Sequence, residues 1–238
     1  MELERIVHSQ GFGSRKQSRV WITAGRVKVN GQIVDNPRAD FPLEGLPIQV
    51  DDIHTLCRQK VYLVLNKPAG FECSHQPQHH ASVFSLLPAH YLARGVQSVG
   101  RLDADTTGLL LFTDDGPLLH ALTSPRRHVP KCYEVQTADP VDDSQLSQLL
   151  AGVVLRDDPQ PVAALSCEQL STHALRLTID QGRYHQVKRM LAAVGNRVVG
   201  LHRMAMGGLV LPEDLAQGAW RELTPEELVL ACQRETAE

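Results

Sequence analysis

The 238-residue sequence has few aromatic residues, few cysteines and no long apolar segment. Aromatic side chains make up only 5% of it, which argues against a platform that stacks many bases in a row. No apolar run approaches the roughly 20 residues that span a bilayer, and the N-terminus lacks the apolar core of a signal peptide. The five cysteines are widely spaced and include no Cys-x-x-Cys pair, which argues against a disulfide framework or a zinc site. We therefore expect a reduced, cytoplasmic protein.

A net charge of −3 is unusual for a protein that binds nucleic acid, but the charges are unevenly distributed. Residues 5–34 contain six basic side chains and no acid, and residues 176–203 contain six basic side chains and one acid. From residue 213 to the end, seven acids outnumber two arginines. Phosphate affinity depends on local patches more than on total charge. The pattern indicates either surfaces that bind nucleic acid or ordinary solvated faces.

The first 57 residues are predicted to form a small module followed by a linker. Ser14 and Gln17 have the spacing of a capping box, so we expect a helix that begins at Arg15 and ends at Gly25. Residues 27–34 are typical of two short strands joined by a tight turn. Residues 35–60 contain three prolines and little periodicity, and we interpret them as the end of the module and the linker.

Residues 58–238 are predicted to form a second domain of the α+β class. We expect buried strands at residues 61–65 and 109–112, a half-exposed strand at 175–179 and a helix at 187–194. Several connections between strands are too short for helical crossovers. These features favour a mixed, mainly antiparallel sheet over a doubly wound parallel one.

The segment from Gly100 to Leu111, Gly-Arg-Leu-Asp-Ala-Asp-Thr-Thr-Gly-Leu-Leu-Leu, carries the most chemical information. A polar turn leads directly into a buried strand, so the carboxylate of Asp103 can be held rigidly at the edge of a cavity. This segment resembles the catalytic motif of the pseudouridine synthases, in which the aspartate is the essential residue. Residues 131–135 and 182–190 resemble the tyrosine and arginine segments of that family, and residues 14–31 resemble an S4 RNA-binding domain.

The resemblance implies an S4-like RNA-binding domain over residues 1–57 and a pseudouridine synthase catalytic domain over residues 58–238. Asp103 would be the catalytic carboxylate, and Tyr133 would stack on the uracil and help to remove its C5 proton. Arg183 would pair with Asp103, keeping that carboxylate ionised and fixing its direction. Because the isomerisation has no redox step, we expect neither a cofactor nor a metal.

The implied substrate is ribosomal RNA. The Tyr184-His185-Gln186 sequence and the strand end at Asn66-Lys67-Pro68 resemble the branch that modifies 16S rRNA of the small subunit. The target uridine must leave its helix, and phosphate contacts would offset the unstacking. We predict that these contacts come from basic residues in both domains, namely Arg15, Lys16, Arg19, Arg26, Lys28, Arg101, Arg126, Arg127 and Lys131. We expect a monomer with no membrane contact.

Other interpretations stay open at this point. The enzyme could act on large-subunit rRNA, or the chain could be a non-catalytic S4 adaptor in ribosome assembly. Asp103 and Asp105 could bind a metal ion in a nuclease, although Asp105 fits a turn better. The histidines of residues 75–80 could also bind metal, but they lack carboxylate or thiol support. His185 is interpreted as a structural hydrogen-bonding residue.

Overall fold

The computed structural model describes residues 1–156 and 158–234, and only the backbone at residues 125 and 159. The chain forms two compact units. The first unit consists of Met1–Val61, Leu87–Gln97 and Thr113–Asp115. The second consists of Tyr62–Leu86, Ser98–Phe112 and the chain from Gly116 onward. Within the described ranges, no helix has the length and hydrophobicity needed to cross a bilayer.

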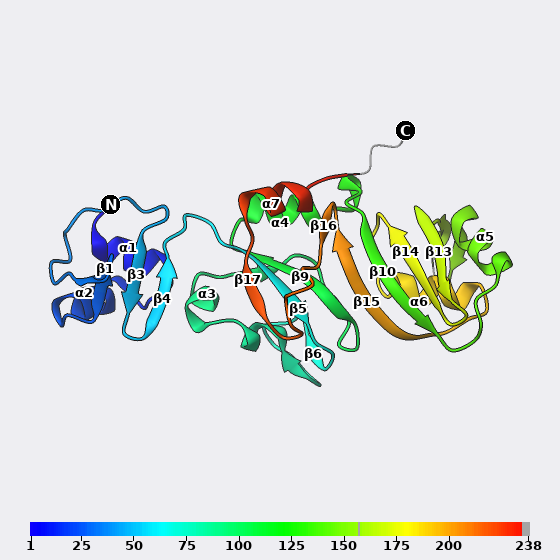
Figure 1. Cartoon of the computed structure of the whole chain (residues 1–238), viewed down its shortest axis with the longest axis horizontal. Helices are drawn as coiled ribbons and strands as arrows, with labels where there is room; N and C mark the ends of the chain where they lie inside the picture. Colours follow the sequence, from blue (N-terminus) through cyan, green and yellow to red (C-terminus); the bar gives the residue numbers. More distant parts are fainter. Residues whose placement is uncertain (157, 235–238) are drawn as a thin grey trace. The chain divides into compact units, whose positions relative to one another are not determined.

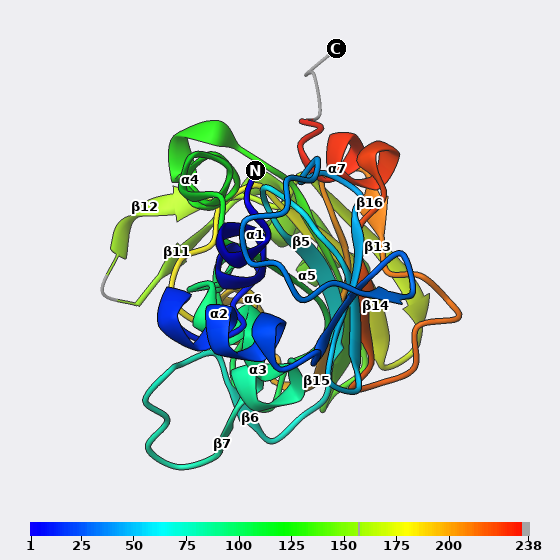
Figure 2. The ribbon, with the colours of Figure 1, turned by 90° about the vertical axis from the view of Figure 1, so that its left-hand side faces the viewer.

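The first unit combines short helices with a small antiparallel sheet. Its elements are α1 (Leu3–Ser9), α2 (Arg15–Thr23), β1 (Val27–Val29), β2 (Gln32–Ile33), β3 (Pro47–Val50), β4 (Ile53–Leu56) and α3 (Ala89–Ala93). The sheet has the strand order β2-β1-β3-β4. Figure 2 shows α1 and α2 packed side by side.

The local signals around α2 are confirmed. Ser14 Oγ accepts a hydrogen bond from the Gln17 backbone nitrogen at 3.3 Å, and the Gln17 side chain accepts one from the Ser14 backbone nitrogen at 2.8 Å. Gly25 has a φ of +69°, as expected for a residue that ends a helix. Asn30 and Gly31 have φ values of +50° and +79°, as the predicted tight turn requires.

The interpretation of residues 35–60 as the end of the module and a linker is wrong over residues 47–56. Strands β3 and β4 form an antiparallel hairpin there, and β3 also pairs with β1. Ile48 and Val50 are buried, so the hairpin belongs to the core of the unit. Each strand has only four residues, and β3 starts at Pro47, so the alternation is too short to stand out among the prolines.

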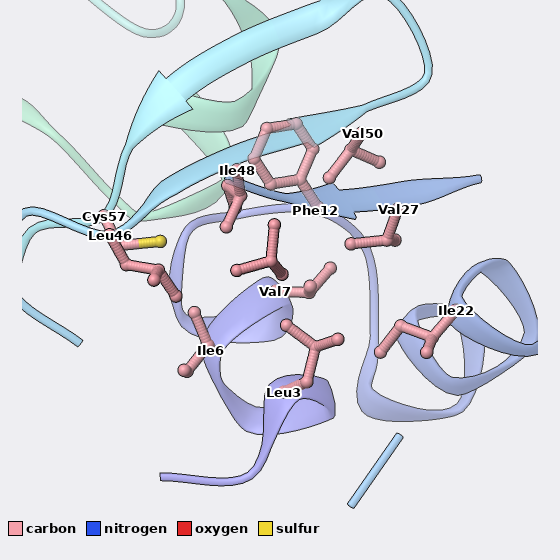
Figure 3. Packing of buried hydrophobic residues seen from close by; sticks show 11 residues of the cluster. Leu3, Ile6, Val7, Phe12, Ile22, Val27, Leu46, Ile48, Val50 and Cys57 are labelled. Atoms are coloured by element: carbon pink, nitrogen blue, oxygen red, sulfur yellow. The ribbon is translucent and has the colours of Figure 1, made fainter. Parts of the chain in front are cut away.

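Side chains from both helices and from the sheet fill the core of the first unit. Figure 3 shows the α1 side chains Leu3, Ile6 and Val7 directed toward residues of the sheet, with Ile22 of α2 beside them. The ring of Phe12 stacks on His90 of α3, with ring centroids 5.0 Å apart. Burial of this apolar surface stabilises the unit.

The second unit is built around a mixed sheet. Its elements are β5 (Tyr62–Lys67), β6 (Phe71–Glu72), β7 (Ala81–Ser82), η1 (Val83–Leu86), β9 (Thr107–Thr113), α4 (Gly116–Thr123), η2 (Pro125–Arg127), β10 (Lys131–Thr137), α5 (Asp143–Ala151), β11 (Val153–Leu155), β12 (Asp158–Val162), β13 (Ser166–Ser171), β14 (Ala174–Ile179), α6 (Gln186–Ala193), β15 (Val198–Met206), β16 (Leu209–Val210), β17 (Trp220–Glu222) and α7 (Pro225–Ala231). The short strand β8 (Gln97–Ser98) falls where a segment of the first unit ends in the sequence.

The main sheet of the second unit has the order β13-β14-β10-β15-β9-β5-β17, with β16 paired to β15 (Figure 1). Strand β10 pairs antiparallel with β14 and β15, and β17 pairs antiparallel with β5. Strands β15 and β9 are parallel. The prediction of an α+β fold with a mixed, mainly antiparallel sheet is confirmed.

The parallel contact between β9 and β15 fixes the loop that precedes β9. Gly108 lies opposite Arg203 and has a φ of +102°. A Cβ atom at this position would lie 2.3 Å from the Arg203 carbonyl oxygen, so a larger residue would push the strands apart. The loop that carries Asp103 is therefore held close to β15.

Candidate active site

The loop before β9 places Asp103 in the wall of a cavity of about 80 Å³. The Thr106 backbone nitrogen donates to the Asp103 carbonyl oxygen at 3.1 Å and closes a turn. Tyr133 on β10 and Arg183 between β14 and α6 line the same cavity, so the fold brings the three predicted catalytic side chains together. The complete lining is Arg101, Leu102, Asp103, Thr106, Tyr133, Ile179, Gly182, Arg183, His185, Gln186, Val187, Lys188 and Leu201.

Two side chains at the start of α6 contact the Asp103 carboxylate. Lys188 Nζ lies 3.2 Å from Asp103 Oδ2, and His185 Nε2 lies 3.2 Å from Oδ1. His185 has a left-handed φ of +48°, and its ring stacks on Tyr184 with centroids 3.8 Å apart. The carboxylate is therefore held by an ammonium group on one oxygen and an imidazole on the other.

Lys188 also binds Asp105, the second carboxylate of the loop. Its Nζ donates to Asp105 Oδ1 at 2.7 Å and to Oδ2 at 2.9 Å. Burial acts to lower the pKa of Lys188, but the hydrogen bonds to Asp105 and Asp103 outweigh burial and raise it. Burial likewise acts to raise the pKa of Asp105, but the hydrogen bond and charge of Lys188 lower it. The ammonium group thus occupies the position between the carboxylates that a bridging cation would need.

The predicted ion pair between Arg183 and Asp103 is not what the structure shows. The Arg183 guanidinium pairs through Nη1 with Asp158 at the start of β12, and its Nε donates to Gln181 Oε1 at 2.9 Å. Arg183 precedes α6, and its side chain contacts Asp158 of the β11–β12 hairpin. Lys188 lies on the first turns of α6, and its side chain contacts the Asp103 loop. Arg183 still lines the cavity, but Lys188 is the residue that pairs with Asp103.

A buried lysine supports the loop from below. Lys67, at the end of β5, has no exposed surface, and its Nζ donates to the carbonyl oxygens of Asp103 at 3.1 Å and Thr106 at 2.8 Å. It also donates to Pro68 and Ala104, so four carbonyl groups share one ammonium. Burial lowers the pKa of Lys67, while the charges of the nearby loop carboxylates oppose that shift. Lys67 therefore fixes the backbone of the loop.

Arg203, on β15, is a second buried cation near this loop. It is 3% exposed, and its Nε donates to the Leu109 carbonyl oxygen at 2.7 Å. Within the described residues its Nη2 has no hydrogen-bond partner. Arg203 also lies opposite Tyr133 in the antiparallel register of β15 and β10. Arg203 therefore adds a second buried positive charge close to Lys67, and positive charge there favours a nearby anion.

Comparison with known proteins identifies the family. A model described as RNA pseudouridylate synthase matches residues 61–193, and an S4 domain model matches residues 1–39. The chain belongs to the RNA pseudouridylate synthases. It is 39% identical over 228 residues to a Haemophilus influenzae protein named ribosomal small subunit pseudouridine synthase A, a match that covers 96% of this chain and 98% of the relative. The Escherichia coli K12 protein of the same name is 41% identical over 234 residues, with the same coverage.

A solved structure supports the same assignment over the whole fold. A crystal structure described as a pseudouridylate synthase matches with a TM-score of 0.69 and 38% sequence identity. The match covers 97% of this chain and 99% of the solved one. The chain is therefore a pseudouridylate synthase with an N-terminal S4 domain, and the cavity at Asp103 is its candidate active site.

Some of the predicted RNA-binding cations of the synthase form ion pairs with carboxylates, and others do not. Arg19 makes two hydrogen bonds to Glu4, at 2.7 Å and 2.9 Å, and Arg26 makes two to Asp51, at 2.7 Å and 2.5 Å. Local charge counting along the sequence missed both carboxylates because neither lies within the acid-free segment. The other three predicted RNA-binding cations of this unit make no ion pair with a described carboxylate; they are Arg15, Lys16 and Lys28.

In the second unit of the synthase, Arg101 is exposed and lines the cavity at Asp103, and Arg126 and Arg127 are exposed on η2. Lys131 is less accessible, and its Nζ donates to the Val129 carbonyl oxygen at 2.6 Å. Burial, assisted by positive charge on β15, lowers the pKa of Lys131 to about 8.

Sequence reasoning missed two residues that shape this site, Lys67 and Lys188. The spacing of three between positions 185 and 188 could have indicated that both side chains project from one helix face. A lysine at the end of a buried apolar strand could likewise have indicated a bound ammonium group, because an unpaired buried charge is strongly disfavoured. Neither signal predicts which residue the lysine contacts, since Asp103 lies 85 residues from Lys188 in sequence.

The described residues contain no cluster of three or more histidine, cysteine or acidic side chains that could hold a metal ion. Of the loop histidines, His75 stacks its ring on Phe84 with centroids 3.6 Å apart. Glu72 accepts hydrogen bonds from the backbone nitrogens of residues 78, 79 and 80 at 2.8–3.0 Å, which organises this loop.

Proposed function

We propose that this synthase isomerises one uridine of 16S rRNA to pseudouridine with Asp103 as the catalytic carboxylate. The observation that carries the proposal is the position of Asp103: at the cavity wall, held by Lys188 and His185, with Tyr133 in the same lining. The small-subunit specificity rests on the relatives, which are named as ribosomal small subunit pseudouridine synthases.

The reaction breaks the N1–C1′ bond, turns the base and joins C5 to C1′. An ionised Asp103 would either attack C1′ or take the C2′ proton, and both steps need the carboxylate to be directed and shielded from water. Lys188 Nζ lies 3.2 Å from Asp103 Oδ2 and helps to fix the direction of the carboxylate. Tyr133, 8% exposed, would stack on the freed uracil and help to remove the C5 proton. Because the product is an isomer of the substrate, the bonds balance without a co-substrate.

Residues 1–57 would form the RNA-binding domain and residues 58–238 the catalytic domain. Phosphate contacts would come from cations of both domains that form no ion pair with a described carboxylate, namely Arg15, Lys16, Lys28, Arg101, Arg126, Arg127 and Lys131. We further propose that the synthase acts as a monomer in the cytoplasm. All five cysteines are free thiols, which suits a reducing compartment.

The proposal is tested by tritium release from 16S rRNA transcribed with C5-tritiated uridine. Release by the wild type, combined with loss of release in Asp103→Asn, supports it. Pseudouridine mapping in rRNA from a strain without this gene then separates the two ribosomal subunits: a missing modification in 16S rRNA is expected. A missing modification in large-subunit rRNA alone would overturn the assignment of substrate.

A further inference from the structure

A second cavity adjoins the catalytic one and shares a wall with it. Its volume is about 370 Å³, and it is lined by Arg126, His128, Gln181, Gly182 and Arg183. Gly182 and Arg183 also line the cavity that contains Asp103. None of the lining residues of the second cavity is acidic, and two of them are arginines. The residues that line this region beside the uridine pocket therefore carry two guanidinium groups, an imidazole and a side-chain amide.

The donors of this cavity are only partly used within the described chain. Arg126 is exposed and pairs with no carboxylate there. Arg183 uses Nη1 for Asp158 and Nε for Gln181, and no described residue accepts from its Nη2. Gln181 accepts from Arg183 through Oε1, which leaves the Gln181 amide nitrogen able to donate. The guanidinium of Arg126, the Nη2 of Arg183 and the amide nitrogen of Gln181 thus remain available to one ligand.

The backbone around the cavity is held in an unusual conformation. His128, which follows η2, has a left-handed φ of +50° although it is not glycine. Its Nδ1 lies 2.6 Å from Asp180 Oδ2, so an ion pair or hydrogen bond holds the ring in place. Left-handed residues of this kind are maintained where the surrounding structure requires them, often at ligand sites.

We infer that this second cavity binds a backbone phosphate of the RNA strand next to the nucleotide held at Asp103. The inference rests on the proposed function and deepens it. Two arginines match the bidentate geometry of a phosphate oxygen pair. Bases and ribose hydroxyls are neutral, so they would not neutralise the charge of two guanidinium groups as a phosphate does. Arg183 lies in the wall shared by the two cavities. It would fix the position of the RNA strand so that the neighbouring uridine enters the catalytic cavity.

The inference gives Asp158 a role as a competitor. In the absence of RNA its carboxylate holds Arg183 Nη1. A phosphate entering the cavity would compete with this carboxylate for the guanidinium, so the Asp158 contact lowers RNA affinity while it keeps Arg183 at the wall. Asp158 is thus a positioning residue, because it acts through Arg183.

A double-mutant cycle tests whether Arg126 and Arg183 share one phosphate. Affinity for a 16S rRNA transcript is measured for Arg126→Gln, Arg183→Gln and the double variant. Each single change should weaken binding about tenfold, as expected for one charged hydrogen-bonding partner. If the two share a phosphate, the double variant should lose much less than the product of the single losses. In the control cycle of Arg126→Gln with Lys16→Gln, the two losses of affinity should multiply. Arg176 is already paired with two glutamates, so Arg176→Gln should bind RNA as tightly as the wild type does.

If the double variant loses affinity by the product of the two single losses, the inference that Arg126 and Arg183 share one phosphate is wrong. An Asp158→Asn variant that fails to strengthen binding in the wild-type background, or that strengthens it equally in Arg183→Gln, would also overturn it. If Arg183→Gln does not fold, Arg183→Met takes its place in the cycle, with the same coupling expected and the same multiplicative result contradicting it. Tritium release by the wild type is measured in parallel, so that failure of the proposed function is seen separately from failure of this site.

Discussion

The ammonium group of Lys188 bridges two carboxylates of the loop before β9, at 3.2 Å from Asp103 Oδ2 and 2.7 Å from Asp105 Oδ1. Its raised pKa keeps the bridge charged through the neutral range. The first turns of α6 and the loop before β9, far apart in sequence, are thereby joined at the candidate active site.

Replacing Lys188 by methionine should reduce single-turnover tritium release on the order of 100-fold, a typical loss for a preorganised charge at a reacting centre. Lys188→Arg restores a positive charge and should recover most of that loss. A structural role alone would not depend on the charge, so equal activity of the methionine and arginine variants would contradict the electrostatic role.

Lys67→Met should destabilise the second unit by about 2–4 kcal/mol, because it leaves carbonyl groups of the catalytic loop without a donor. The measurement is urea unfolding followed by circular dichroism. Lys60→Met is the matched control, since Lys60 is exposed and its Nζ makes a single 3.3 Å contact with the Asp114 carbonyl oxygen. A Lys67 variant as stable as this control would show that the ammonium does not hold the loop.

His90 predicts an acid-sensitive step in the first unit. Burial, with a smaller contribution from the Arg94 charge, lowers its pKa to about 4, and neither ring nitrogen has a described partner. The unfolded chain binds the proton near pH 6.5 and the folded chain only near pH 4, so stability is complete above pH 6.5 and falls as the pH decreases toward 4. The loss attributable to His90 is at most about 3 kcal/mol.

The comparison that isolates this effect is His90→Phe, which retains a ring against Phe12. Free energies of unfolding are measured at several values between about pH 7 and pH 4, the interval in which the proton is taken up. The wild type should lose more stability than the variant over this interval. Parallel curves would mean that other groups account for the acid sensitivity.

The S4 cations should differ in their effect on RNA binding. Lys16→Gln removes an unpaired charge and should decrease the slope of log affinity against log salt by about 1. Arg19→Gln should change that slope less, because Glu4 already neutralises Arg19 in the free protein. The measurement is a salt titration of binding to a 16S rRNA transcript. A larger slope change for Arg19 than for Lys16 would reverse this assignment.

Much of the fold was predictable because its signals are local. The capping box at Ser14 and the turn at Asn30 depend on neighbouring residues, and both are confirmed. The β3–β4 hairpin was missed because its strands gain their stability from pairing with β1, which no short window of sequence contains. Tertiary pairing decides such short elements.

In the candidate site, too, local signals were predictable and tertiary contacts were not. The motif at Asp103 was recognisable as a segment, but its charged partner depends on how the chain turns after β14. Arg183 and Lys188 are five positions apart, and the β11–β12 hairpin binds the first while the loop before β9 binds the second. Likewise, Arg19 and Arg26 were counted as free charges because their carboxylates lie outside the segment.

The most direct test of the catalytic role of Asp103 compares Asp103→Asn with Asp105→Asn. Both changes remove a negative charge that contacts Lys188, so they perturb the same ammonium group. Tritium release from C5-labelled 16S rRNA should be abolished in Asp103→Asn and largely retained in Asp105→Asn. Release by Asp103→Asn at the wild-type rate would contradict the assignment of Asp103 as the catalytic carboxylate.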